Sequence, residues 1–134
     1  MKEAIVAPGP TVTITDAPIP VPEPDQVLIQ VVVSGTNPKD WYQYPLSTPH
    51  TPQCSTTLTN PRKVPEWTNS PSNPGDDIAG IVTSVGANVT EFKPGDRVAA
   101  FHEMMKPSGS FAEYAISWQH TTFHIPHNIS FEGT

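Results

Sequence analysis

Two strand-forming runs joined by a proline–glycine turn constrain the fold of this chain more than any other feature. Residues 78–85 and 97–101 consist mainly of Ile, Val and Ala, and Lys-Pro-Gly-Asp occupies positions 93–96 between them. Pro94 presets φ for the first inner position of a β-turn, and Gly95 adopts a positive φ at little cost. The segment therefore predicts a tight corner between two strands and not a helix.

Proline is frequent along the whole chain, at 17 of 134 residues. Because proline interrupts helices, this composition favours short strands and turns. The run 27–33 is the strongest strand, β-branched and nearly continuous, and we expect it to be buried on both faces. Other strands are expected at residues 3–7, 12–14, 78–86, 96–101 and 111–125, the last broken near Gln119. Short strands at close spacing predict one domain over residues 1–134, a small and mostly antiparallel β-barrel.

The charge and the cysteine content exclude several classes of protein. The net charge is −6 and no cluster of lysine and arginine occurs, which argues against nucleic acid and anionic membranes as partners. The single cysteine, Cys54, rules out an internal disulfide and a cysteine zinc cluster. Without a signal-peptide pattern or an apolar run of membrane-spanning length, a soluble cytoplasmic protein is expected.

Three motifs occur in a characteristic order: Ser-Gly-Thr-Asn-Pro-Lys-Asp-Trp at 34–41, the strand–turn–strand segment over 73–99, and Gly-Ser-Phe-Ala-Glu-Tyr-Ala-Ile at 109–116. Together they resemble the N-terminal, GroES-like half of the medium-chain dehydrogenase/reductase family over nearly the whole chain. The resemblance implies a partly open antiparallel β-barrel with short helical turns. Within the family, the chain is similar to fungal-type enoyl reductases and to quinone oxidoreductases. Such enzymes use NADPH to reduce an activated C=C bond or a quinone.

The dinucleotide-binding part of such an enzyme is not encoded in this sequence. No Gly-x-Gly-x-x-Gly motif follows a strand, and no βαβ pattern occurs. The family places its Rossmann domain after the barrel, about where this sequence stops at Thr134. We therefore expect a truncated, inactive half of a reductase that alone binds NADPH only weakly and that can self-associate through an exposed inter-domain surface. The alternative is a stand-alone GroES-like binding module without catalytic activity.

Residues 42–62 differ in character from the rest of the chain, with seven Ser/Thr, four Pro and one charged residue. Their removal would join Asn37-Pro-Lys-Asp-Trp41 to Lys63-Val-Pro, which restores the sequence motif Asn-Pro-x-Asp-Trp-Lys expected for fungal enoyl reductases. Some of the codons that can encode these residues also contain the donor, branch-point and acceptor sequences of an intron. One hypothesis is that the segment translates a retained in-frame intron. The other is a Pro/Ser-rich surface loop, which chain entropy tolerates. Under either hypothesis, residues 42–62 should be poorly ordered.

Zinc enzymes share this fold, so the zinc-ligand positions are informative. The resemblance places Asn37 and Asp76 where zinc enzymes carry cysteine and histidine, and Asp77 where they carry glutamate. An amide and a carboxylate do not make a tetrahedral zinc site, which indicates the zinc-independent branch. The histidines His120, His124 and His127 form no better site, because on a strand only the first two would share a face.

The loop Asn37-Pro-Lys-Asp40 is the best functional candidate. The resemblance implies that it enters the cleft beside the nicotinamide. There Asn37 would bind substrate or ribose, and Lys39 would act as the catalytic residue by stabilising an enolate or relaying a proton to it. A structural reading is also open, in which Asn-Pro opens a turn, Asp40 caps a helical turn and Lys39 points to solvent.

Further cleft candidates are Asp76 and Trp41. As neighbours on a strand, Asp76 and Asp77 point to opposite faces, so they cannot share a proton as a catalytic dyad. One is expected to face the cleft and the other to cap the turn, and a structural role is favoured over a catalytic one. The aromatic residues Trp41, Trp67 and Phe101 either line a substrate pocket or, as we expect, pack in the core. Five glycines are predicted at turns and close approaches and not in a phosphate cradle: Gly75, Gly80, Gly86, Gly95 and Gly109.

Overall fold

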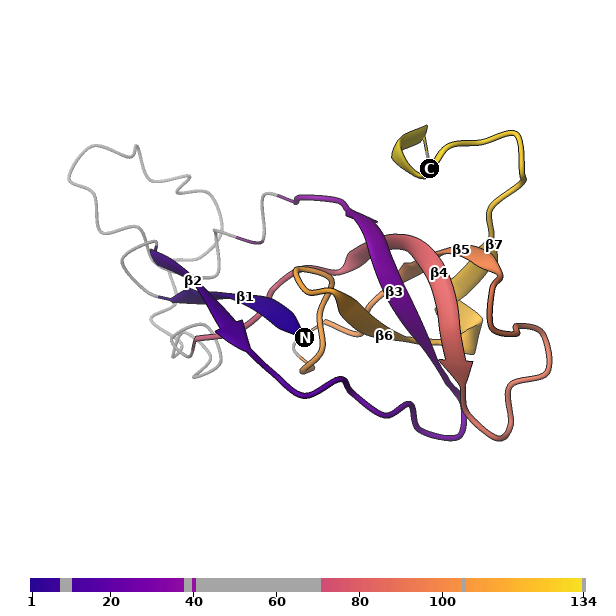
Figure 1. Cartoon of the computed structure of the whole chain (residues 1–134), viewed down its shortest axis with the longest axis horizontal. Coiled ribbons are helices and arrows are strands. Elements are labelled where there is room, and N and C mark those ends of the chain that lie inside the picture. The colour runs from indigo at the N-terminus through magenta and orange to yellow at the C-terminus, as the bar shows by residue number, and fades with distance from the viewer. Residues whose placement is uncertain (8–10, 38–39, 41–70, 105, 134) are drawn as a thin grey trace, which may run out of the picture.

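The structure, a computed structural model, describes residues 1–7, 11–37, 40, 71–104 and 106–133 (Figure 1). Described elements follow the order β1 (Lys2–Ala7), β2 (Thr11–Asp16), β3 (Gln26–Ser34), β4 (Asp77–Val85), β5 (Arg97–Phe101), β6 (Tyr114–Trp118), η2 (Gln119–Thr121), β7 (Thr122–His124) and η3 (Phe131–Gly133). The segment 42–62 lies outside the described residues, so its two readings both stay open.

The strands form two antiparallel sheets. β1 and β2 make a hairpin, and the other five pair in the order β6-β3-β4-β5-β7. The larger sheet curls into a half-barrel, with β3 and β4 running side by side through its middle (Figure 1). The prediction of a mostly β, partly open antiparallel barrel with short helical turns is confirmed. The break expected near Gln119 is the 3-10 turn η2.

The β3–β4 pairing contains two register shifts, one between Leu28 and Ile29 and one between Val31 and Val33. Such irregularities bend a strand and increase its twist, which suits a sheet that must curl. Gly80 of β4 lies in this region, opposite Val31, and a Cβ there would meet the Gln30 carbonyl oxygen at 2.1 Å. The predicted close approach at Gly80 is thus confirmed.

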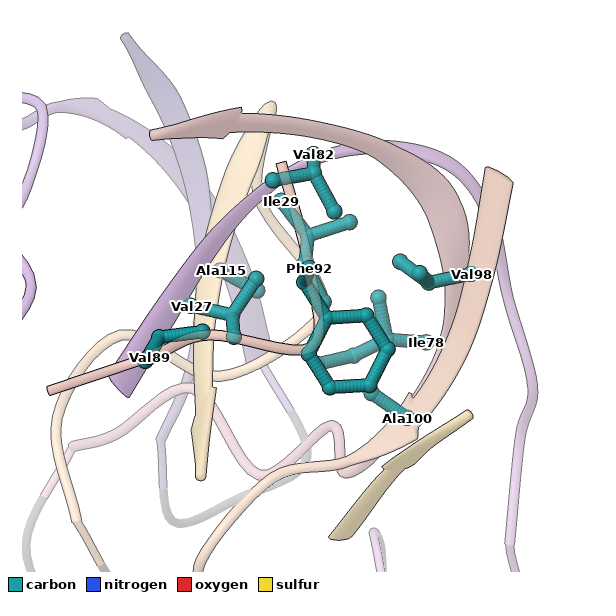
Figure 2. Close-up of a cluster of buried hydrophobic side chains, with 9 residues drawn as sticks. All are labelled: Val27, Ile29, Ile78, Val82, Val89, Phe92, Val98, Ala100 and Ala115. Carbon is teal, nitrogen blue, oxygen red and sulfur yellow. The ribbon is translucent and has the colours of Figure 1, made fainter. Parts of the chain in front are cut away.

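The core lies inside the curl of the larger sheet. Figure 2 shows its nine side chains: Val27, Ile29, Ile78, Val82, Val89, Phe92, Val98, Ala100 and Ala115. Full burial of a Val, Ile or Phe side chain contributes about 1.5–3 kcal/mol each, so this cluster dominates the stability of the barrel. The expectation that 27–33 is buried on both faces is correct only for its first half. At the second register shift, between Val31 and Val33, the side chain of Val32 is 49% exposed.

The corner between β4 and β5 has the predicted chemistry. Gly95 has φ of +94°, and the Asp96 N–H donates to the Lys93 carbonyl at 3.1 Å. The Asp96 carboxylate accepts the Lys93 backbone N–H and its ammonium group, both at 3.0 Å. The hydrogen bond from the Lys93 side chain is the main cause that lowers the pKa of Asp96 below its ordinary 3.8.

The β1–β2 hairpin is fastened to the half-barrel along the outer edge of β1. Ala4 N–H donates to the Phe111 carbonyl, and Val6 exchanges two backbone hydrogen bonds with Ser72. Beside this edge, the buried Asn73 donates to the Gly109 carbonyl at 2.9 Å and accepts the Phe111 N–H at 3.1 Å. One asparagine thus joins the segment before β4 to the segment before β6.

Candidate functional site

The loop that follows β3 closes on itself through Asp40. The Asp40 carboxylate accepts the Asn37 N–H at 2.7 Å, and the Asp40 N–H donates to the Asn37 carbonyl at 3.0 Å. The first bond is the carboxylate half of a capping box, in which an acid three residues on satisfies the first backbone donor of a helical turn, and the second is a backbone turn bond. Asp40 is buried, so its carboxylate shapes the loop from within.

A second acid fastens the same loop to the start of β4. The Asn37 side-chain amide donates to the Asp77 carboxylate at 2.5 Å, and the Gly35 N–H donates to the Asp77 carbonyl at 3.1 Å. A Cβ on Gly35 would lie 2.9 Å from the Asp77 Cβ, so the two backbones approach as closely as glycine permits. The amide of Asn37 is therefore held by a charged acceptor, which strengthens the hydrogen bond.

Asp77 also lies on the rim of a hollow of about 400 Å³ between β4, β5 and η3. Its lining is mainly apolar: Val33, Gly35, Ile78, Ala79, Ala99, Ala100, Phe101, Phe123 and Phe131, with Asp77 and Glu132 as the acidic members. Phe123 is 58% exposed, and Phe101 is also exposed. Phe101, the last residue of β5, was expected to pack in the core. This expectation is wrong, because its side chain is exposed and lines the hollow. An apolar hollow with a few fixed polar groups is the usual form of a small-molecule site.

The neighbouring acid, Asp76, lies in a different environment. Its carboxylate is 3.2 Å from His102 Nδ1, and each of the two side chains is only 3% exposed. His102 Nε2 faces the Pro107 carbonyl at 3.0 Å, so this nitrogen carries a proton and donates. The pair ties the start of β4 to the segment that follows β5.

The described residues therefore bring together two of the predicted site residues, Asn37 and Asp40, in one loop. Asp76 lies in the buried pair, and its cleft role stays a prediction. Lys39 and Trp41 lie outside the described residues, as does Trp67. Of the two neighbouring acids, Asp77 is the one that bonds to the loop after β3. The alternation of side chains along a strand predicts only that Asp76 and Asp77 point to opposite faces, and not which of them meets Asn37.

The histidine pattern differs from the expectation. His120 belongs to η2 and stacks on Trp118 with ring centroids 6.0 Å apart, so it does not share a strand face with His124. His124 packs against Phe92 at 4.9 Å. Among the described residues, no three His, Cys, Asp or Glu side chains gather closely enough to hold a metal ion.

The donors at the zinc-ligand positions do not fit zinc. The Asn37 amide is engaged with the Asp77 carboxylate, and the Asp76 carboxylate faces His102 Nδ1 within the fold. Tetrahedral zinc sites need thiolate or imidazole nitrogen donors with an open lone pair.

Comparison with known proteins identifies the architecture. The family described as "Alcohol dehydrogenase GroES-like domain" matches residues 23–127. The chain belongs to the medium-chain dehydrogenase/reductase family. Trans-enoyl reductase fsr4 of Gibberella fujikuroi is 44% identical over 134 residues, which cover 98% of this chain and 33% of that protein. A quinone oxidoreductase of Rattus norvegicus is 37% identical over 106 residues, 79% of this chain and 26% of the relative.

The fold of this GroES-like domain also matches solved oxidoreductases. The quinone oxidoreductase of Escherichia coli, solved in complex with NADPH, superposes with a TM-score of 0.71 at 21% identity, over 98% of this chain and 35% of that one. The chain spans about a third of the length of its fungal relative. In the described part of the chain, no helix is both long and apolar enough to cross a membrane.

Proposed function

We propose that this chain forms the substrate-side wall of a zinc-independent reductase that adds hydride from NADPH to an activated C=C bond. The observation that carries the proposal is the Asn37–Asp77 hydrogen bond at the rim of the apolar hollow, in a chain 44% identical to a trans-enoyl reductase. An apolar wall suits an acyl or aromatic substrate, and a fixed amide suits the polar end of such a substrate or of the cofactor.

The reaction requires neutralisation of charge on the substrate. Bound NADPH would supply a hydride to the β-carbon of the activated alkene, and the electron pair of the C=C bond would move toward the carbonyl oxygen. A positioned donor lowers the barrier by stabilising that enolate oxygen, and a proton must then reach the α-carbon. We assign the donor and proton roles to Lys39, and the positioning of substrate or ribose to Asn37.

Gly86 and Gly109, two of the close-approach glycines, give NADPH phosphates little room. A Cβ on Gly86 would meet the Glu23 carbonyl oxygen at 2.0 Å, and one on Gly109 would meet the Gly75 carbonyl oxygen at 2.7 Å. These glycines are approached by backbone carbonyl oxygens, which repel phosphate, and not by a cradle of N–H groups. We infer that the cofactor phosphates bind to a second domain, and that residues 1–134 alone have no saturable NADPH binding at micromolar concentration.

A reductase chimera tests the proposal. Residues 1–134 would replace the matching third of the Gibberella fujikuroi trans-enoyl reductase, once with residues 42–62 and once without them. NADPH oxidation would be followed with the crotonyl thioester of N-acetylcysteamine. We expect turnover in at least the version without residues 42–62, and a roughly 10- to 100-fold lower kcat after Asn37→Ala.

The matched control is Asn88→Ala, because Asn88 is exposed and contacts Asp25 at 3.2 Å, away from the hollow. Turnover only without residues 42–62 would support the intron hypothesis, and equal turnover in both versions would support the surface loop. Chimeras that fold and bind NADPH but leave the thioester unreduced would overturn the proposed function. Saturable micromolar NADPH binding to residues 1–134 alone would contradict the division of labour between the domains.

A further inference from the structure

The outer edge of β2 is the longest stretch of unpaired strand in the described structure. β2 reads Thr-Val-Thr-Ile-Thr-Asp over residues 11–16 and pairs only with β1 among the described residues. Val12 and Ile14 are each 63% exposed. Natural edge strands usually carry lysine, proline or a bulge that blocks pairing with another chain. In β2 the only charge is Asp16, at its last position.

The direction of each backbone group follows from the hairpin. Met1 and Ala17 exchange two hydrogen bonds, from the Met1 ammonium to the Ala17 carbonyl and from the Ala17 N–H to the Met1 carbonyl. Because hydrogen-bonded pairs alternate along an antiparallel ladder, the odd-numbered residues of β2 bond to β1. The N–H and C=O groups of Val12, Ile14 and Asp16 therefore point outward, away from β1.

The other edge of the hairpin is already occupied, which limits any assembly. The Ala4 and Val6 N–H groups donate to Phe111 and Ser72, and the Lys2 carbonyl accepts the Glu113 N–H. A partner strand can therefore be added only on the β2 side. An association that uses one edge of each copy closes after two subunits and does not extend into a fibre.

We propose that β2 is a dimerisation edge, and that its partner is β2 of a second copy, paired antiparallel about a two-fold axis at Ile14. In this register Ile14 faces Ile14 of the partner subunit, and Val12 faces Asp16 of the partner subunit. All three outward residues then bond to outward residues, with two N–H···O bonds at each hydrogen-bonded pair. The strand is thus complementary to its own copy.

The charges and side chains of β2 also fit this register. Asp16 is paired with Lys2 at 2.6 Å, and the two copies of Asp16 would lie about 14 Å apart along the strands. That separation exceeds the screening length of roughly 8 Å at physiological ionic strength. Ala4 pairs with Ile14 in the hairpin, so the two Ile14 side chains would complete an apolar row across four strands.

Sedimentation equilibrium of the 134-residue chain tests the proposal. We expect a concentration-dependent species of twice the 14.5 kDa monomer mass at tens of micromolar. Ile14→Lys and Ile14→Glu should each weaken dimerisation at least tenfold, because like charges would meet at the two-fold axis. An equimolar mixture of the two variants should recover the dimer, because opposite charges then face each other. Thr13→Lys is the matched control, because its side chain lies on the other face of β2 and would oppose Thr15 and not itself.

Hydrogen exchange gives an independent readout. In the dimer, the amides of Val12, Ile14 and Asp16 should become protected as the concentration rises, whereas those of Thr13 and Thr15 should change little. A chain that stays monomeric at 100 micromolar overturns the proposal. So does a dimer that both Ile14 variants leave intact, which would place the interface elsewhere, or a mixture that fails to restore association.

Discussion

Asn37 and Asp77, forty positions apart in sequence, are joined by a 2.5 Å hydrogen bond from the side-chain amide to the carboxylate. The bond connects the loop after β3 to the first residue of β4, and Asp77 also borders the apolar hollow. The orientation of Asn37 thus depends on a residue that itself belongs to the sheet. This places the amide on a rigid support, as a site for positioning a ligand requires.

Removal of the Asp77 carboxylate should release Asn37 without disturbing the rest of the reductase chimera. We expect Asp77→Ala to lower kcat for the crotonyl thioester about 10- to 100-fold, because a misplaced positioning group costs rate. The KM for NADPH should change less than kcat, since the cofactor phosphates are held elsewhere. Glu132→Gln is the control, as Glu132 is an exposed acid on the same hollow. An Asp77 variant with full kcat would show that the hydrogen bond has no role in turnover.

The buried Asp76–His102 pair should matter for stability. Removal of one side chain leaves the other buried without its charge or hydrogen-bond partner, which typically lowers the free energy of unfolding by about 3–5 kcal/mol. We expect His102→Ala to lower the free energy of unfolding in urea by about 3 kcal/mol. The double variant with Asp76→Ala should cost clearly less than the sum of the two single variants. Additive losses would indicate that the two side chains stabilise the fold independently.

The turn at residues 93–96 should give a pH-dependent contribution to stability. The hydrogen bond from Lys93 lowers the pKa of Asp96 in the folded state, so the folded state prefers the ionised carboxylate. This stabilisation is present above the unfolded pKa of about 3.8 and is lost as the pH falls through the lowered folded-state value. Asp96→Asn should therefore destabilise the chain at about pH 6 and much less at about pH 2. The free energy of unfolding, measured in urea at both values, checks this, and an equal loss at both would contradict it.

Gly80 should tolerate no side chain. A Cβ there would overlap the Gln30 carbonyl oxygen at 2.1 Å. Gly80 and Gln30 both lie in the paired strands β3 and β4 in the centre of the sheet, so neither backbone can move aside freely. We expect Gly80→Ala to cost about 3 kcal/mol, because the β3–β4 pairing must open to admit the methyl group. Gly133→Ala is the control, since its nearest neighbour would be a serine hydroxyl at 3.4 Å. Equal melting temperatures for the two variants would contradict this account of Gly80.

Local features of this fold could be predicted from sequence and long-range ones could not. The turn at Pro94 and Gly95 follows from two residues whose backbone preferences are intrinsic. The burial of Val32 and Phe101 was predicted incorrectly, because it depends on where the sheet curves and which side stays open. Whether Asp76 or Asp77 faces Asn37 depends on the register between β3 and β4, which adjacent residues do not encode. The same holds for His102, since a single histidine after a strand gives no indication of a buried partner 26 positions earlier.

The register shift between Val31 and Val33 has an evolutionary consequence. The strand β4 meets β3 beyond this irregularity at Ser34 and Ile78, next to Asp77. Because side chains alternate at every residue, the gain or loss of one residue in β3 would move Asn37 away from Asp77. The Asp76–His102 pair would stay in place, because it is set by the pairing of β4 with β5. Lineages that carry this domain should therefore accept many substitutions along residues 31–34, yet show almost no single-residue insertions or deletions there.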